Sequence, residues 1–166
     1  MTTQEIRQLI RDNTPDPAIA LAQAQAESNF NPNAVSNRGA VGLFQFLPAT
    51  FAQYGSGDPR DPMASIQARN AYMSYLLGLS DGDYAIALGA YNAGEGRVIL
   101  GYKDSSGVHH NGLVQDYGTN WLAHAPAETQ GYVNRILGNQ GNFHQAPATK
   151  PKRRKPTTGS PKTTRG

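Results

Sequence analysis

The chain has 166 residues, 38% of them apolar, which is enough to build one core and suits a single domain with a tail. It contains no cysteine, which excludes disulfides, thiolate metal sites and cysteine nucleophiles. The net charge of +3 is unevenly distributed, because residues 1–144 hold all twelve acids and eight of the fifteen bases, and residues 145–166 hold the other seven. We therefore expect a folded domain over residues 1–144 and a basic tail over residues 145–166.

The tail is rich in Pro, Lys, Thr and Gly and lacks apolar periodicity, which predicts disorder. Its bases, concentrated between Lys150 and Lys155, suit contact with a phosphate polyanion such as DNA or with an anionic envelope polymer. A solubilising tail without a partner fits the same composition. Elsewhere we find no export signal and no run of the roughly 18 apolar residues that a membrane span needs, so no membrane-spanning segment is expected.

In residues 1–144 the apolar residues recur at spacings of three and four, which predicts a mainly α domain without a β-sheet core. Thr2 and Glu5 have the spacing of a capping box at the start of a first helix. Asp16 is expected to cap a second helix, with Pro17 at its first position, through the segment PAIALAQAQAES.

Turn-forming residues separate the later helices. Residues 29–42 are dense in Asn, Gly and Pro, which predicts a loop that Phe30 and Val35 pin to the core. Residues 101–125 are predicted to form a long polar loop, either functional or variable, with Trp121 more simply its partly buried anchor than a sugar-stacking residue. Further helices are expected over residues 43–54, after Asp61 from Pro62 to about Gly78, after Asp83 through the segment DYAIALGAYNAG, and from about Pro126 to Leu137.

Glu27 is a conspicuous carboxylate, because it ends a segment that carries no other charge after Pro17. Burial among apolar groups raises the pKa of a carboxyl, and the negative end of a helix dipole acts in the same direction. Both effects favour a protonated Glu27 near neutral pH, the form needed to donate a proton to a glycosidic oxygen. From residue type alone, a solvated residue in the last helical turn is the more frequent interpretation.

Four short motifs occur in order from Glu27 onward, and together they are far more specific than any one of them. They are Glu27-Ser28, Gly42-Leu43-Phe44-Gln45, Ala90-Tyr91-Asn92-Ala93-Gly94 and Glu128-Thr129-Gln130-Gly131-Tyr132-Val133. With these motifs the chain resembles the soluble lytic transglycosylase (SLT) domain family, which has a lysozyme-like fold. The resemblance implies a peptidoglycan lytic transglycosylase, a lyase without a cofactor or a metal. Such an enzyme cleaves the β-1,4 bond between N-acetylmuramic acid and N-acetylglucosamine and leaves 1,6-anhydromuramic acid ends.

The resemblance also implies roles for individual residues. Glu27 matches the family's only catalytic acid, which protonates the leaving oxygen and then acts as a base. The positions that match substrate-binding residues are Ser28 beside the scissile sugar, Gln45 in the cleft, Tyr91 and Asn92 as a contacting pair, and Tyr132, whose hydroxyl orients the glutamate or a substrate group.

Ordinary glycosidases use two carboxylates, but the next acid after Glu27 is Asp58, which lies beside a helix cap and is more often a turn residue than a catalyst. With a single acid, the nucleophile is expected to be the substrate's own 6-hydroxyl, as the resemblance implies. His109 and His110 are not favoured as metal ligands, because adjacent side chains point apart and no acid-rich zinc pattern surrounds them.

Other functions stay open at this point. A hydrolytic muramidase on the same fold would use water, a non-catalytic structural or assembly protein would only bind glycan, and a nucleic-acid-binding protein would act through its tail. Because peptidoglycan lies outside the cytoplasmic membrane and no export signal is found, the expected setting is a bacteriophage virion that opens the host wall locally, with virion proteins as partners. Cytoplasmic retention until lysis, or specialised export, is the alternative.

Overall fold

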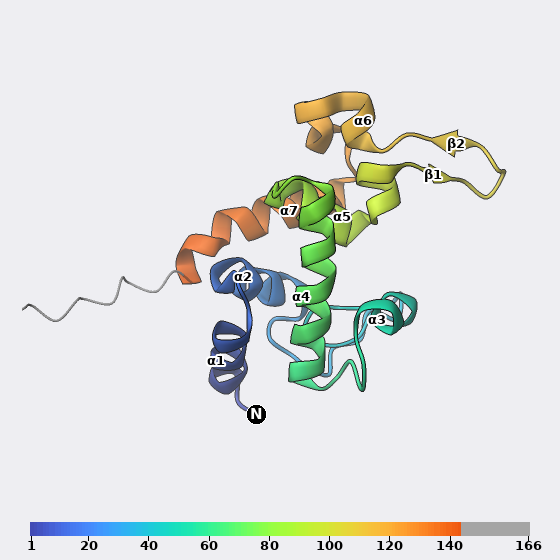
Figure 1. Ribbon diagram of the computed structural model, residues 1–166. Helices are drawn as coiled ribbons and strands as arrows, with labels where there is room; N and C mark the ends of the chain where they lie inside the picture. Colours follow the sequence, from blue (N-terminus) through green and yellow to red (C-terminus); the bar gives the residue numbers. More distant parts are fainter. Residues whose placement is uncertain (144–166) are drawn as a thin grey trace, which may run out of the picture.

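The computed structural model describes residues 1–143 (Figure 1). The tail expected at residues 145–166, its disorder and its boundary at residue 144 lie outside the described residues. Residues 1–143 form seven α-helices, several short helical segments and one two-stranded hairpin, so the prediction of a mainly α fold without a β-sheet core is confirmed. In this part of the chain, none of the helices combines the length and the apolar character that crossing a membrane requires.

The first two helices, α1 (Thr3–Asn13) and α2 (Pro17–Ser28), begin where predicted. The capping box is confirmed, because Oγ1 of Thr2 accepts from the backbone N–H of Glu5 at 3.1 Å and the Glu5 carboxylate accepts from the backbone of Thr2 at 2.6 Å. Asp16 occupies the cap position of α2, but its side chain makes no capping hydrogen bond, so that part of the prediction is wrong. Its carboxylate binds the buried Arg69 instead.

α2 ends at Ser28 and is capped by Asn29, whose backbone is left-handed with φ 51°, so Glu27 lies in the last turn as expected. In the following loop Phe30 is buried as predicted, whereas Val35 is 57% exposed and does not pin the loop. The helix expected over residues 43–54 begins later, as α3 (Pro48–Tyr54). Gln45 breaks the predicted first turn, because its φ of 50° is incompatible with a right-handed helix.

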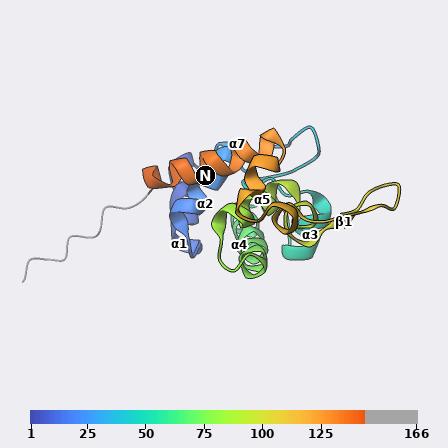
Figure 2. The same cartoon turned by 90° about the horizontal axis from the view of Figure 1, so that it is seen from above.

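The centre of the fold consists of α4 (Pro62–Leu79), α5 (Tyr84–Ala93) and α7 (Ala127–Asn139). The caps of the first two are confirmed, since Asp61 accepts from the backbone N–H of Ala64 at 2.9 Å and Asp83 accepts from that of Ile86 at 3.1 Å. α5 packs against both α4 and α7, and α7 also packs against α2 (Figure 2). This arrangement brings α2 and α7, which are far apart in sequence, into contact.

The prediction of a long polar loop over residues 101–125 is wrong, because much of this segment has regular backbone structure. A π-helical turn η1 (Gly96–Leu100) leads into strands β1 (Tyr102–Lys103) and β2 (His109–His110), which pair as an antiparallel hairpin projecting from the body (Figure 1). The segment continues as α6 (Leu113–Tyr117) and a 3₁₀ segment η2 (Gly118–His124), and η3 (Gln140–Phe143) follows α7.

Trp121 is the anchor of this segment, as expected. Its side chain is 4% exposed and packs on α5 where the helix has a glycine. A Cβ atom at Gly89 would lie 2.4 Å from the indole ring, so only glycine allows this approach. The indole is therefore part of the core.

Candidate active site

A cavity of about 650 Å³ lies between the end of α2, the loop after it, the end of α5 and the start of α7. Its volume is within the range of small-molecule sites. Four of the six residues predicted for the site line it: Glu27, Gln45, Tyr91 and Asn92. The rest of the wall includes polar and aromatic residues that had not been predicted for the site, namely Asn37, Arg38, Thr50, Tyr72, Glu95 and Glu128.

The carboxyl group of Glu27 is held by Tyr132, whose hydroxyl donates to Oε1 at 2.7 Å. Burial raises the pKa of Glu27 to about 8, the nearby Glu128 carboxylate adds to the rise, and the Tyr132 hydrogen bond only partly opposes it. The burial effect predicted from the uncharged sequence around Glu27 is thus confirmed. Glu27 is mostly protonated at neutral pH, as a general acid must be.

Tyr132 itself is 5% exposed and does not line the cavity. It reaches Glu27 from α7, so the first and fourth motifs meet in space, 105 residues apart in sequence. The sequence placed Tyr132 in the site only through the family resemblance, and the structure gives it a direct hydrogen bond to the carboxyl.

Gln45 is placed by a tight turn whose backbone requires the preceding glycine. The φ of Gly42 is 88°, and a Cβ atom there would lie 2.2 Å from the carbonyl oxygen of Pro59. Nε2 of Gln45 donates to the carbonyl of Gly42 at 2.9 Å and to that of Ala34 at 3.1 Å. The side chain therefore closes the turn while also forming part of the cavity wall.

The third motif joins the cavity through Tyr91 and Asn92 at the end of α5. The Tyr91 hydroxyl donates to the carbonyl of Phe44 at 2.8 Å, which links α5 to the turn that carries Gln45. Oδ1 of Asn92 accepts from the Thr129 hydroxyl at 2.8 Å, which links it to α7. These bonds bring the second, third and fourth motifs together around one cavity.

Ser28, like Tyr132, is a predicted site residue that does not line the cavity. Its hydroxyl donates to the carbonyl of Leu43 at 2.9 Å and lies 3.2 Å from that of Ala24. It therefore fastens the end of α2 to the turn of the second motif.

Two further carboxylates line the cavity with Glu27. Glu95 accepts a hydrogen bond from the Tyr72 hydroxyl at 2.7 Å, and Glu128 lies 3.8 Å from Arg38 in an exposed ion pair. Spacing along the chain had left Glu27 without a nearby acid, because Glu95 and Glu128 reach the cavity only through the packing of α5 and α7. The lack of a second acid was one reason to expect the substrate's own 6-hydroxyl as the nucleophile. Because Glu95 and Glu128 line the cavity, that reason no longer holds.

The signal for these acids was present, since Glu95 directly follows the third motif and Glu128 begins the fourth. Within residues 1–143, no three His, Asp or Glu side chains converge closely enough to hold a metal ion. His110, which was not favoured as a metal ligand, has its Nε2 atom 2.8 Å from Oδ2 of Asp104 in the hairpin.

Residues 5–109 match the family model of the transglycosylase SLT domain, which is more than half of the chain. The chain belongs to the SLT domain family. Its resemblance to membrane-bound lytic murein transglycosylase D of Escherichia coli (strain K12) is 35% identity over 117 residues, covering 67% of this chain and 25% of that protein. Membrane-bound lytic murein transglycosylase C of Pectobacterium atrosepticum is 31% identical over 154 residues, covering 78% of this chain and 43% of that protein. This SLT domain thus spans less than half the length of either relative.

Among solved structures, the domain resembles the 70-kDa soluble lytic transglycosylase of Escherichia coli, with a TM-score of 0.63 and 24% identity over 84% of this chain and 24% of that chain. The complex of the 70-kDa soluble lytic transglycosylase with bulgecin A gives a TM-score of 0.62 at 23% identity, covering the same shares of the two chains. These likenesses establish the lysozyme-like SLT fold that the four motifs implied.

Proposed function

We propose that this SLT domain is a peptidoglycan lytic transglycosylase in which Glu27 is the general acid and then the general base. The observation that carries the proposal is the carboxyl of Glu27, which lines the cavity with a pKa of about 8 and is held by Tyr132. The names of the two relatives, both lytic murein transglycosylases, support the same reaction.

In the proposed reaction, Glu27 donates its proton to the glycosidic oxygen between N-acetylmuramic acid and N-acetylglucosamine. The bond from that oxygen to C1 breaks, and N-acetylglucosamine leaves with a 4-hydroxyl. The Glu27 carboxylate then takes the proton of the muramic acid 6-hydroxyl as its oxygen attacks C1, which closes the 1,6-anhydro ring. No water is consumed and Glu27 ends protonated, ready for another turnover.

The other site residues would hold the glycan. Gln45, Tyr91 and Asn92 are proposed to contact the sugars from the cavity wall. Ser28 is proposed to act beside the scissile sugar, although its hydroxyl would have to leave the carbonyl of Leu43 to do so. Tyr132 would orient Glu27 directly.

A hydrolytic muramidase is the second candidate, and the two additional carboxylates favour it. Glu95 and Glu128 share the cavity with Glu27, and a carboxylate that activates water is what an inverting glycosidase requires. The two candidates differ in whether the product gains a water.

Mass spectrometry of peptidoglycan digested in ¹⁸O-labelled water would separate the two. A transglycosylase yields muramic acid ends that are one water lighter and carry no label, whereas a hydrolase yields labelled reducing ends. Glu27→Gln is the control, and it should abolish either product while retaining the far-UV spectrum of the folded protein. Labelled ends would contradict the transglycosylase, and full activity of Glu27→Gln would contradict both candidates.

We also propose that the domain opens a bacterial wall locally for a phage particle, and that its tail contacts DNA or another polyanion. The support for the tail contact is compositional, since seven bases and no acid occur in residues 145–166. Docking to virion proteins would serve the same setting.

A further inference from the structure

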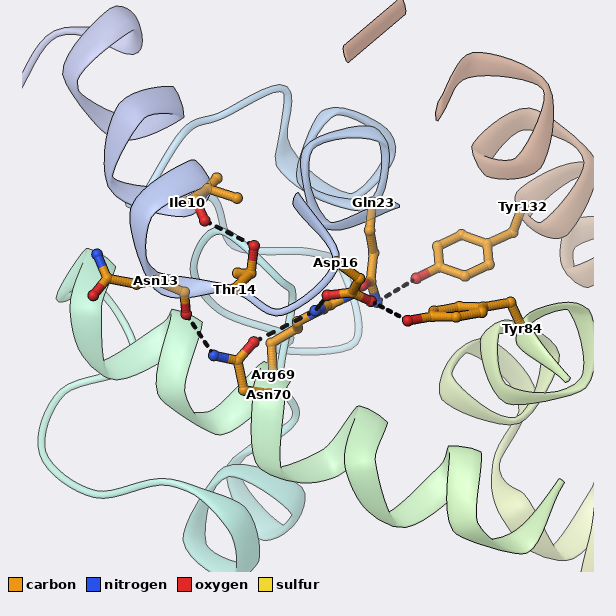
Figure 3. Close-up of polar contacts among 9 residues, drawn as sticks. All are labelled: Ile10, Asn13, Thr14, Asp16, Gln23, Arg69, Asn70, Tyr84 and Tyr132. Atoms are coloured by element: carbon orange, nitrogen blue, oxygen red, sulfur yellow. Dashed lines mark hydrogen bonds and ion pairs between the residues drawn. The ribbon is translucent and has the colours of Figure 1, made fainter. Parts of the chain in front are cut away.

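A row of buried polar side chains lies behind Glu27, on the side away from the cavity. Gln23, one helical turn before Glu27 on α2, and Arg69 on α4 are both completely buried. Figure 3 shows Arg69 meeting both Gln23 and Asp16, with the hydroxyl of Tyr132 pointing toward Gln23. A buried guanidinium and a buried amide are costly unless each is fully hydrogen-bonded, so their arrangement is informative.

The direction of each hydrogen bond in this row follows from Arg69, because a guanidinium can only donate. Its Nε donates to Oε1 of Gln23 at 2.9 Å, and its Nη2 donates to the carboxylate of Asp16, also at 2.9 Å. The oxygen of the Gln23 amide must therefore face Arg69. Its Nε2 faces the opposite way and donates to the hydroxyl oxygen of Tyr132 at 3.1 Å.

Tyr132 has one hydroxyl proton, and the bond from Gln23 already occupies one side of its oxygen. The proton is left to bond Oε1 of Glu27, 2.7 Å away. An oxygen that accepts this bond is disfavoured as the site of the acid proton, which therefore resides on Oε2.

Resting on the function proposed above, we infer that Gln23 and Arg69 are positioning residues: they make Tyr132 a fixed donor to Oε1 of Glu27 and so keep the catalytic proton on Oε2. The reacting proton is held on one oxygen before the substrate arrives. Such preorganisation is what general-acid catalysis gains from a rigid supporting shell.

The uncharged Gln23 is essential to this arrangement. A guanidinium in direct contact with Glu27 would favour the carboxylate and remove the acid. Here the charge of Arg69 is balanced by Asp16, which also accepts from the Tyr84 hydroxyl at 2.8 Å. The Gln23 amide accepts from Arg69 and donates to Tyr132, so it sets the direction of the next hydrogen bond while keeping the positive charge away from Glu27.

Gln23→Glu is the sharpest test, because it keeps the size of the side chain and its bond to Arg69 but replaces the donor by an acceptor. Tyr132 would then donate to residue 23, and the Glu27 proton would turn toward Tyr132. We expect kcat for anhydro-muropeptide release at pH 6 to fall at least tenfold with KM within twofold of the wild-type value.

The pH profile separates this effect from added charge. The groups facing Glu27 are Tyr132 and Glu128 of α7 and Tyr91 of α5, with Arg69 of α4 behind Gln23. Glu95 and Arg38, which pairs with Glu128, line the same cavity. A new negative charge among them would raise the pKa of Glu27 and move only the alkaline limb, since Glu27 is already protonated at pH 6. Loss of the orientation of the Glu27 proton would instead lower kcat on the plateau of the pH profile.

Gln23→Met is the comparison variant, because it removes the donor to Tyr132 without placing a carboxylate there, although it also removes the acceptor for Arg69. We expect its plateau to lie between those of the wild-type protein and Gln23→Glu. An unchanged plateau in Gln23→Glu, or equal losses in the two folded variants, would overturn the inference. If Gln23→Glu does not fold, a wild-type plateau in Gln23→Met overturns it. Wild-type protein without anhydro product would instead refute the proposed function, whatever the variants do.

Discussion

Glu27 has its pKa raised by burial, so its proton should be visible in the pH dependence of activity. Because the protonated form is the acid, kcat/KM is expected to fall as pH rises through about 8. Tyr132→Phe removes the hydrogen bond that favours the carboxylate, so this limb should move to higher pH. Misplacing the carboxyl should also lower kcat by roughly 10- to 100-fold.

The measurement is the pH–rate profile of muropeptide release for both proteins. Tyr117→Phe is a suitable control, because this exposed tyrosine lies outside the cavity wall. A limb that stays in place in Tyr132→Phe would contradict the assigned role of the hydroxyl.

The same carboxyl makes stability depend on pH. The folded state retains the Glu27 proton up to about pH 8, whereas the unfolded chain loses it near its ordinary value of 4.5. The unfolded state therefore binds fewer protons between these values, and the free energy of unfolding falls as pH rises across that window. Glu27→Gln cannot titrate and should avoid this loss.

We expect Glu27→Gln to gain stability over the wild-type protein progressively from about pH 4.5 to about pH 8, reaching about 3 kcal/mol at pH 7. Urea unfolding at a series of pH values measures the difference. A difference that does not vary with pH would show that Glu27 is not a buried acid.

At the residue scale, the sequence was informative where a charged side chain occurs in an otherwise uncharged segment. Glu27 was recognisable because a lone acid in an uncharged, alanine-rich helix is costly. Arg69 offered no such signal, because an arginine on a predicted helix is usually solvated and nothing local indicates that it will be buried against Gln23 and Asp16. Its partners lie 46 and 53 residues away.

At the element scale, three aspartates precede helices, and only two of them are caps in the chemical sense. Asp61 and Asp83 bond the first turns of their helices, whereas Asp16 instead binds Arg69 and Tyr84. The local pattern is the same for all three, so the difference arises from tertiary contacts. A cap position can therefore be predicted from sequence more securely than the partner of its side chain.

Replacing each kind of aspartate by alanine should lower the stability of the protein by a different amount. Asp16→Ala leaves the buried Arg69 without its counter-charge and should cost about 3 to 5 kcal/mol. Asp83→Ala removes an exposed cap and should cost about 1 kcal/mol. Denaturant unfolding of the two variants makes the comparison, and equal losses would mean that the Asp16 pair stabilises no more than a cap does.

Two elements were mispredicted because local composition and hydrophobic spacing do not reveal tertiary contacts or backbone dihedral angles. The polar composition of residues 101–125 predicts a loop, yet polar residues also form a hairpin and short helices when Trp121 anchors them to the core. The start of α3 was placed too early because Leu43 and Phe44, apolar residues of a tight turn, resemble the first turn of a helix. Hydrophobic spacing does not reveal the positive φ of Gln45.

At the scale of the whole molecule, the order of four motifs predicted the fold better than any single element did. The first three motifs line the site through Glu27, Gln45 and Tyr91, and the fourth holds Glu27 through the Tyr132 hydroxyl. A hydrogen bond from Tyr91 to the second motif joins two of these walls. Glu95 and Glu128 adjoin or begin motifs, but the motif order alone does not show that their carboxylates line the cavity. Their positions depend on how the ends of α5 and α7 face the cavity.

Charge is divided along the whole chain, with a net −4 in residues 1–144 and +7 in residues 145–166. If the tail contacts DNA, binding should be driven by counterion release, and the logarithm of the binding constant should fall by about 0.9 per phosphate contact for each unit of log salt concentration. Full engagement of the seven bases would give a slope of about −6.

Fluorescence anisotropy with a short DNA duplex over a range of salt concentrations would test this in the full chain. Replacing the seven tail bases by glutamine should nearly abolish the slope, whereas Arg60→Gln with Arg135→Gln, which neutralises two exposed bases of the domain, should leave it within one unit. Muropeptide release should be the same in both variants, since no tail residue is proposed for the cavity. A slope that survives loss of the tail charges would assign DNA binding to the domain and remove the proposed role of the tail.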